Sequence, residues 1–116
     1  ENDLAGLVRF LPADRLKEAR EAGVRVLDVR TAIELQRAPA ASDAQIPLDE
    51  LRERFFELDR TVRWAVLCKV GQRAYNAARI LMQEGYDAEV IEGGYTSLKM
   101  EEFEASPVAA APAKAL

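Results

Sequence analysis

Cys68 is the residue of this 116-residue chain best suited to chemistry, since the sequence holds one cysteine and no histidine. It follows an apolar run and opens the short loop CKVGQR, which contains Gly71 and ends at Arg73, where a helical pattern begins. A cysteine between a strand of a parallel sheet and the next helix faces the unpaired N–H groups of that helix's first turn. The loop therefore indicates an anion site in which a thiolate is the anion.

The helix dipole alone is too weak to make such a thiol reactive. A free thiol is largely protonated at neutral pH, and the dipole favours the anion by only about 0.3 to 1 kcal/mol. We therefore expect loop N–H groups and the cations of Lys69 and Arg73 to add stabilisation. The helix dipole disfavours a cation such as Arg73 at the start of a helix, so the presence of Arg73 there indicates a nearby anion. A lone cysteine after a buried strand is also commonly an inert small hydrophobe, and this alternative stays open.

The composition excludes several other chemistries. One cysteine and no histidine rule out an internal disulfide, a Cys/His zinc site and a catalytic imidazole. A net charge of -4 gives no basic footprint for nucleic acid. No apolar run approaches the roughly 20 residues that span a bilayer, and no signal peptide opens the chain. We expect a cytoplasmic protein with no metal, nucleic-acid or membrane partner.

The elements that must position Cys68 alternate between two patterns. Thr31 and Glu34 form a T-x-x-E capping box that predicts the start of a short helix. Further helices are predicted over 12–22, 48–58 and 73–84, and strands over 24–29, 62–67 and 88–91. Strands written as near-continuous apolar runs between helices predict an α/β fold, with a mainly parallel sheet covered on both faces.

The two ends of the chain differ from its middle. We interpret residues 1–104 as one domain and 105–116, rich in alanine and proline, as a linker or tail, because such a tract buries too little surface to offset its ordering entropy. The chain starts with Glu1 rather than methionine, and we expect it to be part of a longer protein.

Several motifs together resemble a rhodanese-like (sulfurtransferase) domain in order and spacing, over roughly residues 7–103. They are LDVR at 27–30, Glu34, IPLDEL at 46–51, CKVGQR at 68–73 and EGGY at 92–95. The resemblance implies a three-layer domain with about five strands, in which Cys68 accepts a sulfane sulfur as a persulfide and passes it to a thiol acceptor. The six-residue loop matches the family's sulfurtransferases; the related phosphatase and arsenate-reductase loops are one residue longer, which argues against phosphate-ester hydrolysis.

The resemblance also assigns roles around Cys68. The loop residues that would cradle the substrate are Lys69, Val70, Gly71, Gln72 and Arg73. Lys69 and Arg73 would also steer an anionic donor, and Asp28 and Arg30 would support the loop, although a surface ion pair at the strand end is an equally open interpretation. Tyr75 would rim the pocket or simply pack against it. Gly93 and Gly94 are interpreted as turn residues.

A closer likeness concerns the segment VGQRAYNAARIL at 70–81 together with Gly93, Gly94 and Tyr95. It is similar to the rhodanese module fused behind FAD-dependent pyridine nucleotide-disulfide oxidoreductases of the coenzyme A-disulfide or polysulfide reductase type. That likeness implies a fused flavoenzyme partner to which FAD, NAD(P)H and coenzyme A belong, with no cofactor in this domain. The alternative is a docking or regulatory module of that oxidoreductase in which Cys68 is idle.

One segment departs from the family pattern. Where the family carries a GHIPGA-like turn, residues 38–43 read APAASD, so the length is kept while both glycines and the histidine are lost. We expect the loss of the glycines to shift the turn's conformation or make it mobile, and the loss of the histidine to affect the fit of the substrate.

Overall fold

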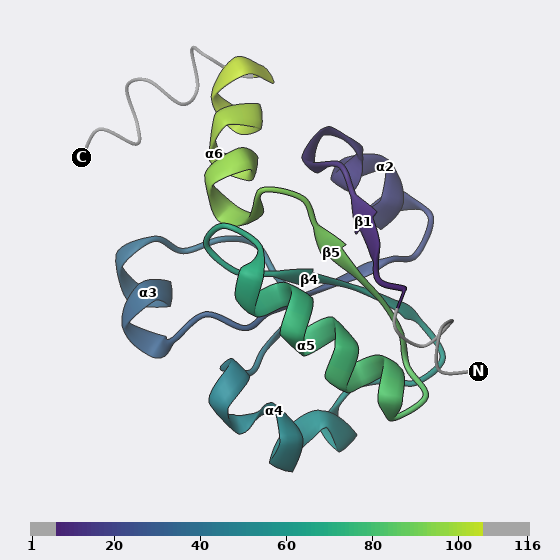
Figure 1. Cartoon of the computed structure of the whole chain (residues 1–116). Coiled ribbons are helices and arrows are strands. Elements are labelled where there is room, and N and C mark those ends of the chain that lie inside the picture. The colour runs from purple at the N-terminus through teal and green to yellow at the C-terminus, as the bar shows by residue number, and fades with distance from the viewer. Residues whose placement is uncertain (1–6, 106–116) are drawn as a thin grey trace.

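A five-stranded, all-parallel sheet forms the centre of the computed structural model, which describes residues 7–105 (Figure 1). The strands are β1 (Arg9–Leu11), β2 (Arg25–Asp28), β3 (Ala44–Gln45), β4 (Arg63–Leu67) and β5 (Asp87–Ile91), in the order β1-β5-β4-β2-β3. Leu27 pairs with Val66, which pairs in turn with Val90, so the three central strands end at one edge. This confirms the predicted α/β fold with a parallel sheet.

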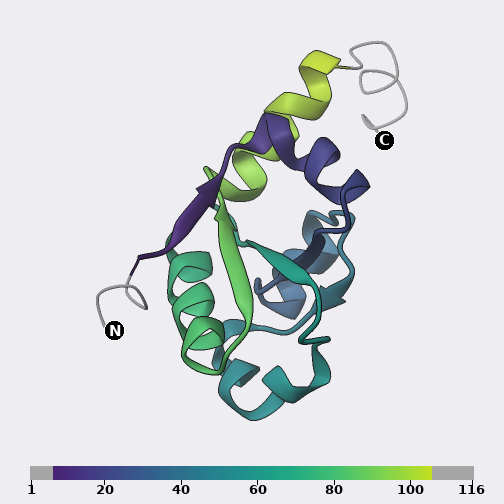
Figure 2. The same cartoon turned by 90° about the vertical axis from the view of Figure 1, so that its right-hand side faces the viewer.

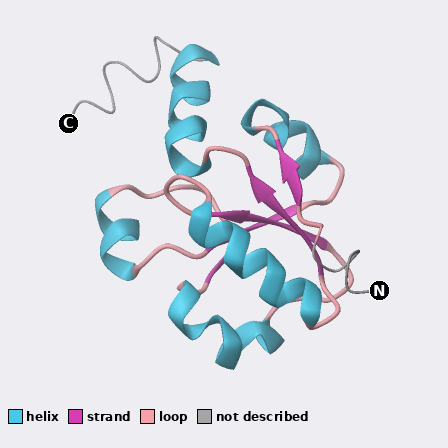
Figure 3. Ribbon diagram, viewed as in Figure 1, coloured by secondary structure: helices cyan, strands magenta, loops and turns pink. Residues whose placement is uncertain are grey.

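The helices cover both faces of this sheet, which gives the expected three layers (Figures 2 and 3). Their bounds are η1 (Ala13–Arg15), α2 (Leu16–Glu21), α3 (Ala32–Arg37), α4 (Leu48–Arg54), η2 (Phe55–Glu57), α5 (Gln72–Gln83) and α6 (Gly94–Ala105). One face packs against α4 and α5, and the other packs against α2 and the start of α6. Within residues 7–105, no helix has both the length and the apolar character needed to cross a membrane.

Strand β4 divides its side chains between two apolar clusters, as the alternation of a strand requires. Trp64 and Val66 join the cluster under α4 and α5, whereas Ala65 and Leu67 join the cluster under α2 and α6. Cys68 continues the first series and belongs to the cluster of α5. The sheet therefore directs the cysteine side chain toward the helix that follows it.

The start and stop signals of the helices are confirmed. Glu34 N–H donates to Thr31 Oγ1 at 3.2 Å, and Thr31 N–H donates to Glu34 Oε1 at 2.9 Å, so the capping box is complete in both directions. Helices α2 and α5 are followed by Gly23 and Gly85, which have φ values of +104° and +90°. A positive φ ends a helix with little strain at glycine.

The sequence prediction missed three elements. Strands β1 and β3 lie at the two edges of the sheet and have only three and two residues, too few for a periodic pattern. Helix α6 was also missed, because Gly93 and Gly94 were interpreted as a turn that closes the last strand, whereas Gly94 is the first residue of this helix. Residues 106–116 of the predicted tail lie outside the described residues.

The turn that departs from the family pattern adopts ordinary backbone conformations. Every positive φ in the described part of the chain belongs to a glycine, so residues 38–43 need none. Asp43 N–H donates to the Val26 carbonyl at 2.8 Å, and the Asp43 carboxylate accepts from Val26 N–H at 2.7 Å. These two bonds fasten the end of the turn to β2.

Candidate functional site

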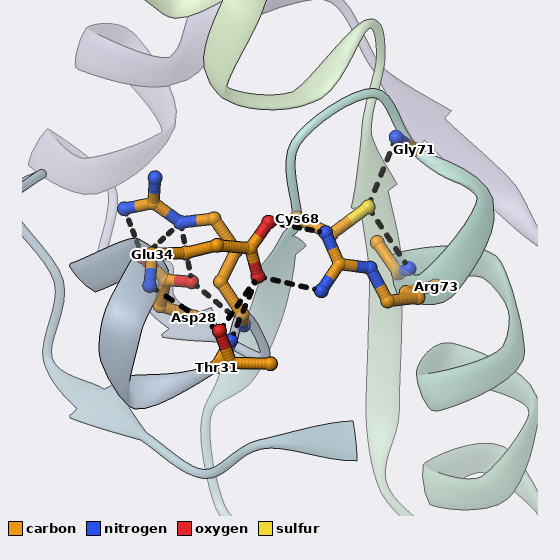
Figure 4. A network of polar contacts seen from close by, with 8 residues as sticks. Asp28, Thr31, Glu34, Cys68, Gly71 and Arg73 are labelled. Atoms are coloured by element: carbon orange, nitrogen blue, oxygen red, sulfur yellow. Dashed lines mark hydrogen bonds and ion pairs between the residues drawn. The ribbon is translucent and has the colours of Figure 1, made fainter. Parts of the chain in front are cut away.

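Two backbone N–H groups converge on the sulfur of Cys68 (Figure 4). Gly71 N–H donates to Sγ at 2.9 Å and Ala74 N–H donates to it at 3.3 Å. Gly71 has φ +121°, a conformation that L side chains rarely adopt, and it is the N-cap residue of α5. The first turn of α5 therefore supplies unpaired donors to a sulfur that is an acceptor when ionised.

The donors differ in part from the expected cradle of loop amides. Gly71 belongs to the predicted set, but Ala74 lies one residue beyond it and was not anticipated. The sequence signal that could have found Ala74 is the helix start itself, since the third residue of a helix still has a free N–H. Cys68 is also only 1% exposed, so the structure encloses the sulfur more completely than the sequence suggested.

The outer side of the loop is held by the first turn of α6. Tyr95 N–H donates to the Cys68 carbonyl at 2.7 Å, and Thr96 N–H donates to the Lys69 carbonyl at 3.2 Å. A Cβ on Gly94 would lie 2.4 Å from the Cys68 carbonyl oxygen, so only glycine permits this approach. Because α6 binds the carbonyls of Cys68 and Lys69, it fixes the main chain of the loop that carries the Gly71 amide. The sequence prediction assigned no such role to Gly94.

Arg73 has a fixed anionic partner. Its Nη1 and Nη2 donate to Glu34 Oε1 and Oε2 at 2.7 and 2.8 Å, a bidentate pair that joins α5 to α3 across the loop. The hydrogen bond from Arg73 lowers the pKa of Glu34 from 4.5 to about 2, and the pKa of Arg73 is raised in return. The anion that a cation at a helix start calls for is thus a carboxylate of the chain. That Arg73 also steers an anionic donor stays a prediction.

Asp28 and Arg30 form a second bidentate pair, at the carboxyl end of β2. Arg30 Nε donates to Asp28 Oδ1 at 3.0 Å and Nη2 donates to Oδ2 at 2.9 Å. The two side chains are 0% and 2% exposed, so the interpretation as a surface ion pair is wrong. The Arg30 guanidinium also lies 4.5 Å from the ring centroid of Tyr95, whose N–H binds the Cys68 carbonyl. The pair thus supports the loop through Tyr95.

The remaining predicted site residues do not supply the two hydrogen bonds that the structure gives to the sulfur. Lys69, Val70 and Gln72 lie at the loop surface, where Lys69 and Gln72 are exposed and Val70 is 62% exposed. Tyr75 is half-buried and stacks on Phe10, with ring centroids 6.3 Å apart and an interplanar angle of 17°. Its observed role is therefore to pack α5 against β1. Among residues 7–105, no group of three or more Cys, Asp or Glu side chains is placed to hold a metal ion.

The family of this chain follows from comparison with known protein families. Residues 12–101 match the family model of the rhodanese-like domain. The chain belongs to the rhodanese-like domain family. A curated relative named as a sulfurtransferase, from Allochromatium vinosum, is 30% identical over 63 residues, which are 54% of this chain and 59% of the relative. These findings identify the chain as a sulfurtransferase-type domain.

Two solved structures that are similar to this rhodanese-like domain belong to much longer chains. Reduced CoADR-RHD of Bacillus anthracis superposes with a TM-score of 0.77 at 32% identity, over 84% of this chain and 17% of that one. A NAD-dependent persulfide reductase from A. fulgidus superposes with a TM-score of 0.64 at 32% identity, over 83% of this chain and 17% of that one. The chain also spans only 41% to 59% of the length of the curated relatives it matches.

Proposed function

We propose that Cys68 is a sulfur carrier that accepts a sulfane sulfur as a persulfide and delivers it to a thiol acceptor. The observation that carries the proposal is the convergence of Gly71 N–H and Ala74 N–H on Sγ. Hydrogen bonds from backbone donors stabilise a thiolate without a nearby base, which this chain could not supply from histidine.

The reaction divides into two balanced steps. In the first, the Cys68 thiolate attacks the sulfane sulfur of the donor, a Cys68–sulfur bond forms, and the donor's sulfur–sulfur bond breaks with its electron pair leaving on the remainder of the donor. In the second, an acceptor thiolate attacks the outer sulfur of the persulfide, and the Cys68 thiolate leaves. No external oxidant or reductant is needed, because the sulfane sulfur changes partners in each step.

The loop N–H groups that do not bind the inner sulfur have a place in this scheme. The outer sulfur of a persulfide carries negative charge, and the remaining donors from Lys69 to Arg73 line the same short loop. We assign to them the binding of that outer sulfur. Preorganised backbone donors of this kind stabilise developing charge with little reorganisation.

We further propose that the acceptor is a flavoenzyme domain of the same protein, a disulfide or polysulfide reductase. The support is the likeness to CoADR-RHD and to the persulfide reductase, each of which extends well beyond the region matched by this domain. FAD, NAD(P)H and coenzyme A would bind to that reductase. No residue of this domain is assigned to them.

A second candidate function is a docking or regulatory module with an idle cysteine. It is favoured by the low exposure of Cys68, 1%, because a sulfur that no donor reaches cannot exchange. The two functions differ in one measurable property, which is whether the sulfur of Cys68 takes up sulfane sulfur in solution.

The test is sulfur loading followed by transfer. The protein is incubated with inorganic polysulfide, freed of reagent and examined by intact mass, with Cys68→Ser as the matched control. We expect one added sulfur atom on the parent, none on the variant, and loss of the added atom when a small thiol is supplied. A parent protein that stays unloaded under these conditions would contradict the carrier function.

A further inference from the structure

We infer that this domain discriminates against thiosulfate in favour of donors whose sulfane sulfur is attached to an uncharged group, such as an alkyl persulfide, and that Glu34 is the residue that sets this preference. The inference rests on the proposed function of Cys68 as a sulfur carrier. It concerns which donor class that site accepts.

The charges around the sulfur are already balanced within the chain. Arg73, the cation at the end of the loop, is bidentate to Glu34 at 2.7 and 2.8 Å. Arg30, behind the loop, is bidentate to Asp28 and 2% exposed. A guanidinium in a bidentate pair keeps free N–H groups, but the pair as a whole has no net charge and attracts a second anion less than an unpaired guanidinium does. Both arginines therefore compensate the charge of an arriving sulfonate less than unpaired arginines would.

Burial of Cys68 raises the free-energy cost of bringing an anionic group to the sulfur when its charge is poorly compensated. Cys68 is 1% exposed, so the group next to the sulfane sulfur must lose most of its water before the thiolate can reach it. Thiosulfate carries a sulfonate directly on that sulfur and keeps two negative charges. Removing such a group from water without a paired cation costs far more than removing an alkyl chain. The enclosed site thus favours an uncharged neighbour.

Lys69 is the cation of the loop that the structure leaves exposed. Its backbone carbonyl accepts from Thr96 N–H at 3.2 Å, which fixes the main chain, while the side chain is open to solvent. An exposed ammonium on a flexible stem is well hydrated and screened by salt, so it attracts anions from a distance but does not replace a paired guanidinium at the sulfur.

The two donors react through the same bond change with different leaving groups. With thiosulfate, the thiolate attacks the outer sulfur, the sulfur–sulfur bond breaks and sulfite leaves with the electron pair, which gives the Cys68 persulfide anion. With protonated 2-hydroxyethyl persulfide, the thiolate attacks the terminal sulfur, the 2-hydroxyethyl thiolate leaves, and the proton stays on the new persulfide. Only the first reaction brings a dianion to the loop.

The variant Glu34→Gln separates the two donors. It removes the carboxylate charge and releases Arg73, so we expect the rate constant for loading by thiosulfate to rise roughly threefold to tenfold. Loading by 2-hydroxyethyl persulfide should stay within about twofold of the parent, because the group attached to its sulfane sulfur is uncharged. The thiosulfate gain should shrink in high salt and should disappear in the double variant Glu34→Gln with Arg73→Gln.

The controls distinguish failure of the inference from failure of the proposed function. If neither donor loads the parent, the carrier function itself is contradicted. If the persulfide loads the parent but Glu34→Gln changes both donors alike, or leaves thiosulfate no faster, the role of Glu34 is overturned. Should the Gln variant not fold, Glu34→Asp draws the carboxylate back while keeping its charge, and a smaller rise for thiosulfate alone is expected. An unchanged donor ratio in the Asp variant would then overturn the inference.

Discussion

Two bidentate arginine–carboxylate pairs flank the Cys68 loop, and they differ in burial and in the length of chain they close. Asp28 and Arg30 are two residues apart, and their side chains are 0% and 2% exposed. Glu34 and Arg73 are 39 residues apart, and theirs are 30% and 34% exposed. The Asp28–Arg30 pair, which we call the inner pair, is part of the folded core. The Glu34–Arg73 pair, which we call the outer pair, lies at the surface and joins α3 to α5.

The difference shows how one kind of contact can serve two purposes. A buried charge that loses its partner has no water to replace it, so the inner pair cannot be altered without loss of stability. A half-exposed pair is partly hydrated in either state and contributes little to stability, so it can be changed to alter the charge near the sulfur. The fold depends on the first pair and, in our account, donor selection depends on the second.

The largest expected effect comes from breaking the inner pair. Asp28→Asn leaves the Arg30 guanidinium buried beside a neutral amide, and we expect the free energy of unfolding to fall by about 3 to 5 kcal/mol in urea denaturation. Combining it with Arg30→Met removes the orphaned charge and should recover a large part of this loss. A loss below about 1 kcal/mol for the single variant would mean that the inner pair behaves like a surface pair.

A second substitution tests whether the backbone, rather than the outer pair, holds the loop. In Gly94→Ala the new Cβ would meet the Cys68 carbonyl oxygen at 2.4 Å and the Lys69 carbonyl oxygen at 2.6 Å, so the loop must shift. We expect sulfur loading of Cys68 to slow by roughly tenfold to a hundredfold, because small misplacements of reacting groups have effects of this size.

Gly23→Ala is the matched control, since Gly23 also has a positive φ but a Cβ at this position would meet no atom within 4 Å. It should cost about 1 kcal/mol of stability through strain and leave the loading rate unchanged. Equal loading rates in the Gly94 and Gly23 variants would show that α6 does not position the loop.

The outer pair should contribute less to stability than the inner one, and its contribution should depend on pH. Glu34→Gln is expected to lower the free energy of unfolding by about 1 kcal/mol at neutral pH. Because Arg73 lowers the pKa of Glu34 from 4.5 to about 2, the contribution is present above pH 4.5 and is lost as the pH falls toward about 2. Denaturation of parent and variant over this range checks the sign. A difference that grows toward low pH would contradict the account.

The smallest effect is expected at an ion pair that is remote from the loop. Glu57 pairs with Arg54 at 2.9 Å where η2 follows α4, and both side chains are well exposed. Glu57→Gln should leave both the unfolding midpoint and the donor preference of Cys68 unchanged, as exposed pairs commonly contribute nothing measurable. A change in donor preference in this variant would show that the effect of Glu34→Gln is a general response to charge.

Much of the central fold was predictable because its signals are local. The apolar runs of β2, β4 and β5, the capping box at Thr31 and the glycines after α2 and α5 each act over a few residues. The edge strands β1 and β3 were missed because two or three residues pair only through partners distant in sequence. Helix α6 was missed because the glycines before it indicate a turn equally well.

The type of site could be predicted from the sequence, but the particular hydrogen bonds and ion pairs that form it could not. A cysteine between an apolar strand and a helix start indicated amides around a sulfur, and the spacing alone could not say which amides reach it. The partner of Arg73 was not predictable, because Glu34 had a sufficient local explanation in its capping box. When one side chain makes two contacts, the sequence reveals only the contact with the residue that is close along the chain.

The most direct test of the central claim is to observe the amides of Gly71 and Ala74 while Cys68 takes up sulfur. In ¹⁵N-labelled protein, we expect the N–H resonances of these two residues to move more on loading by polysulfide than those of α4, and not to move in Cys68→Ser. Loading confirmed by mass while both resonances stay in place would contradict the claim that these two donors hold the reacting sulfur.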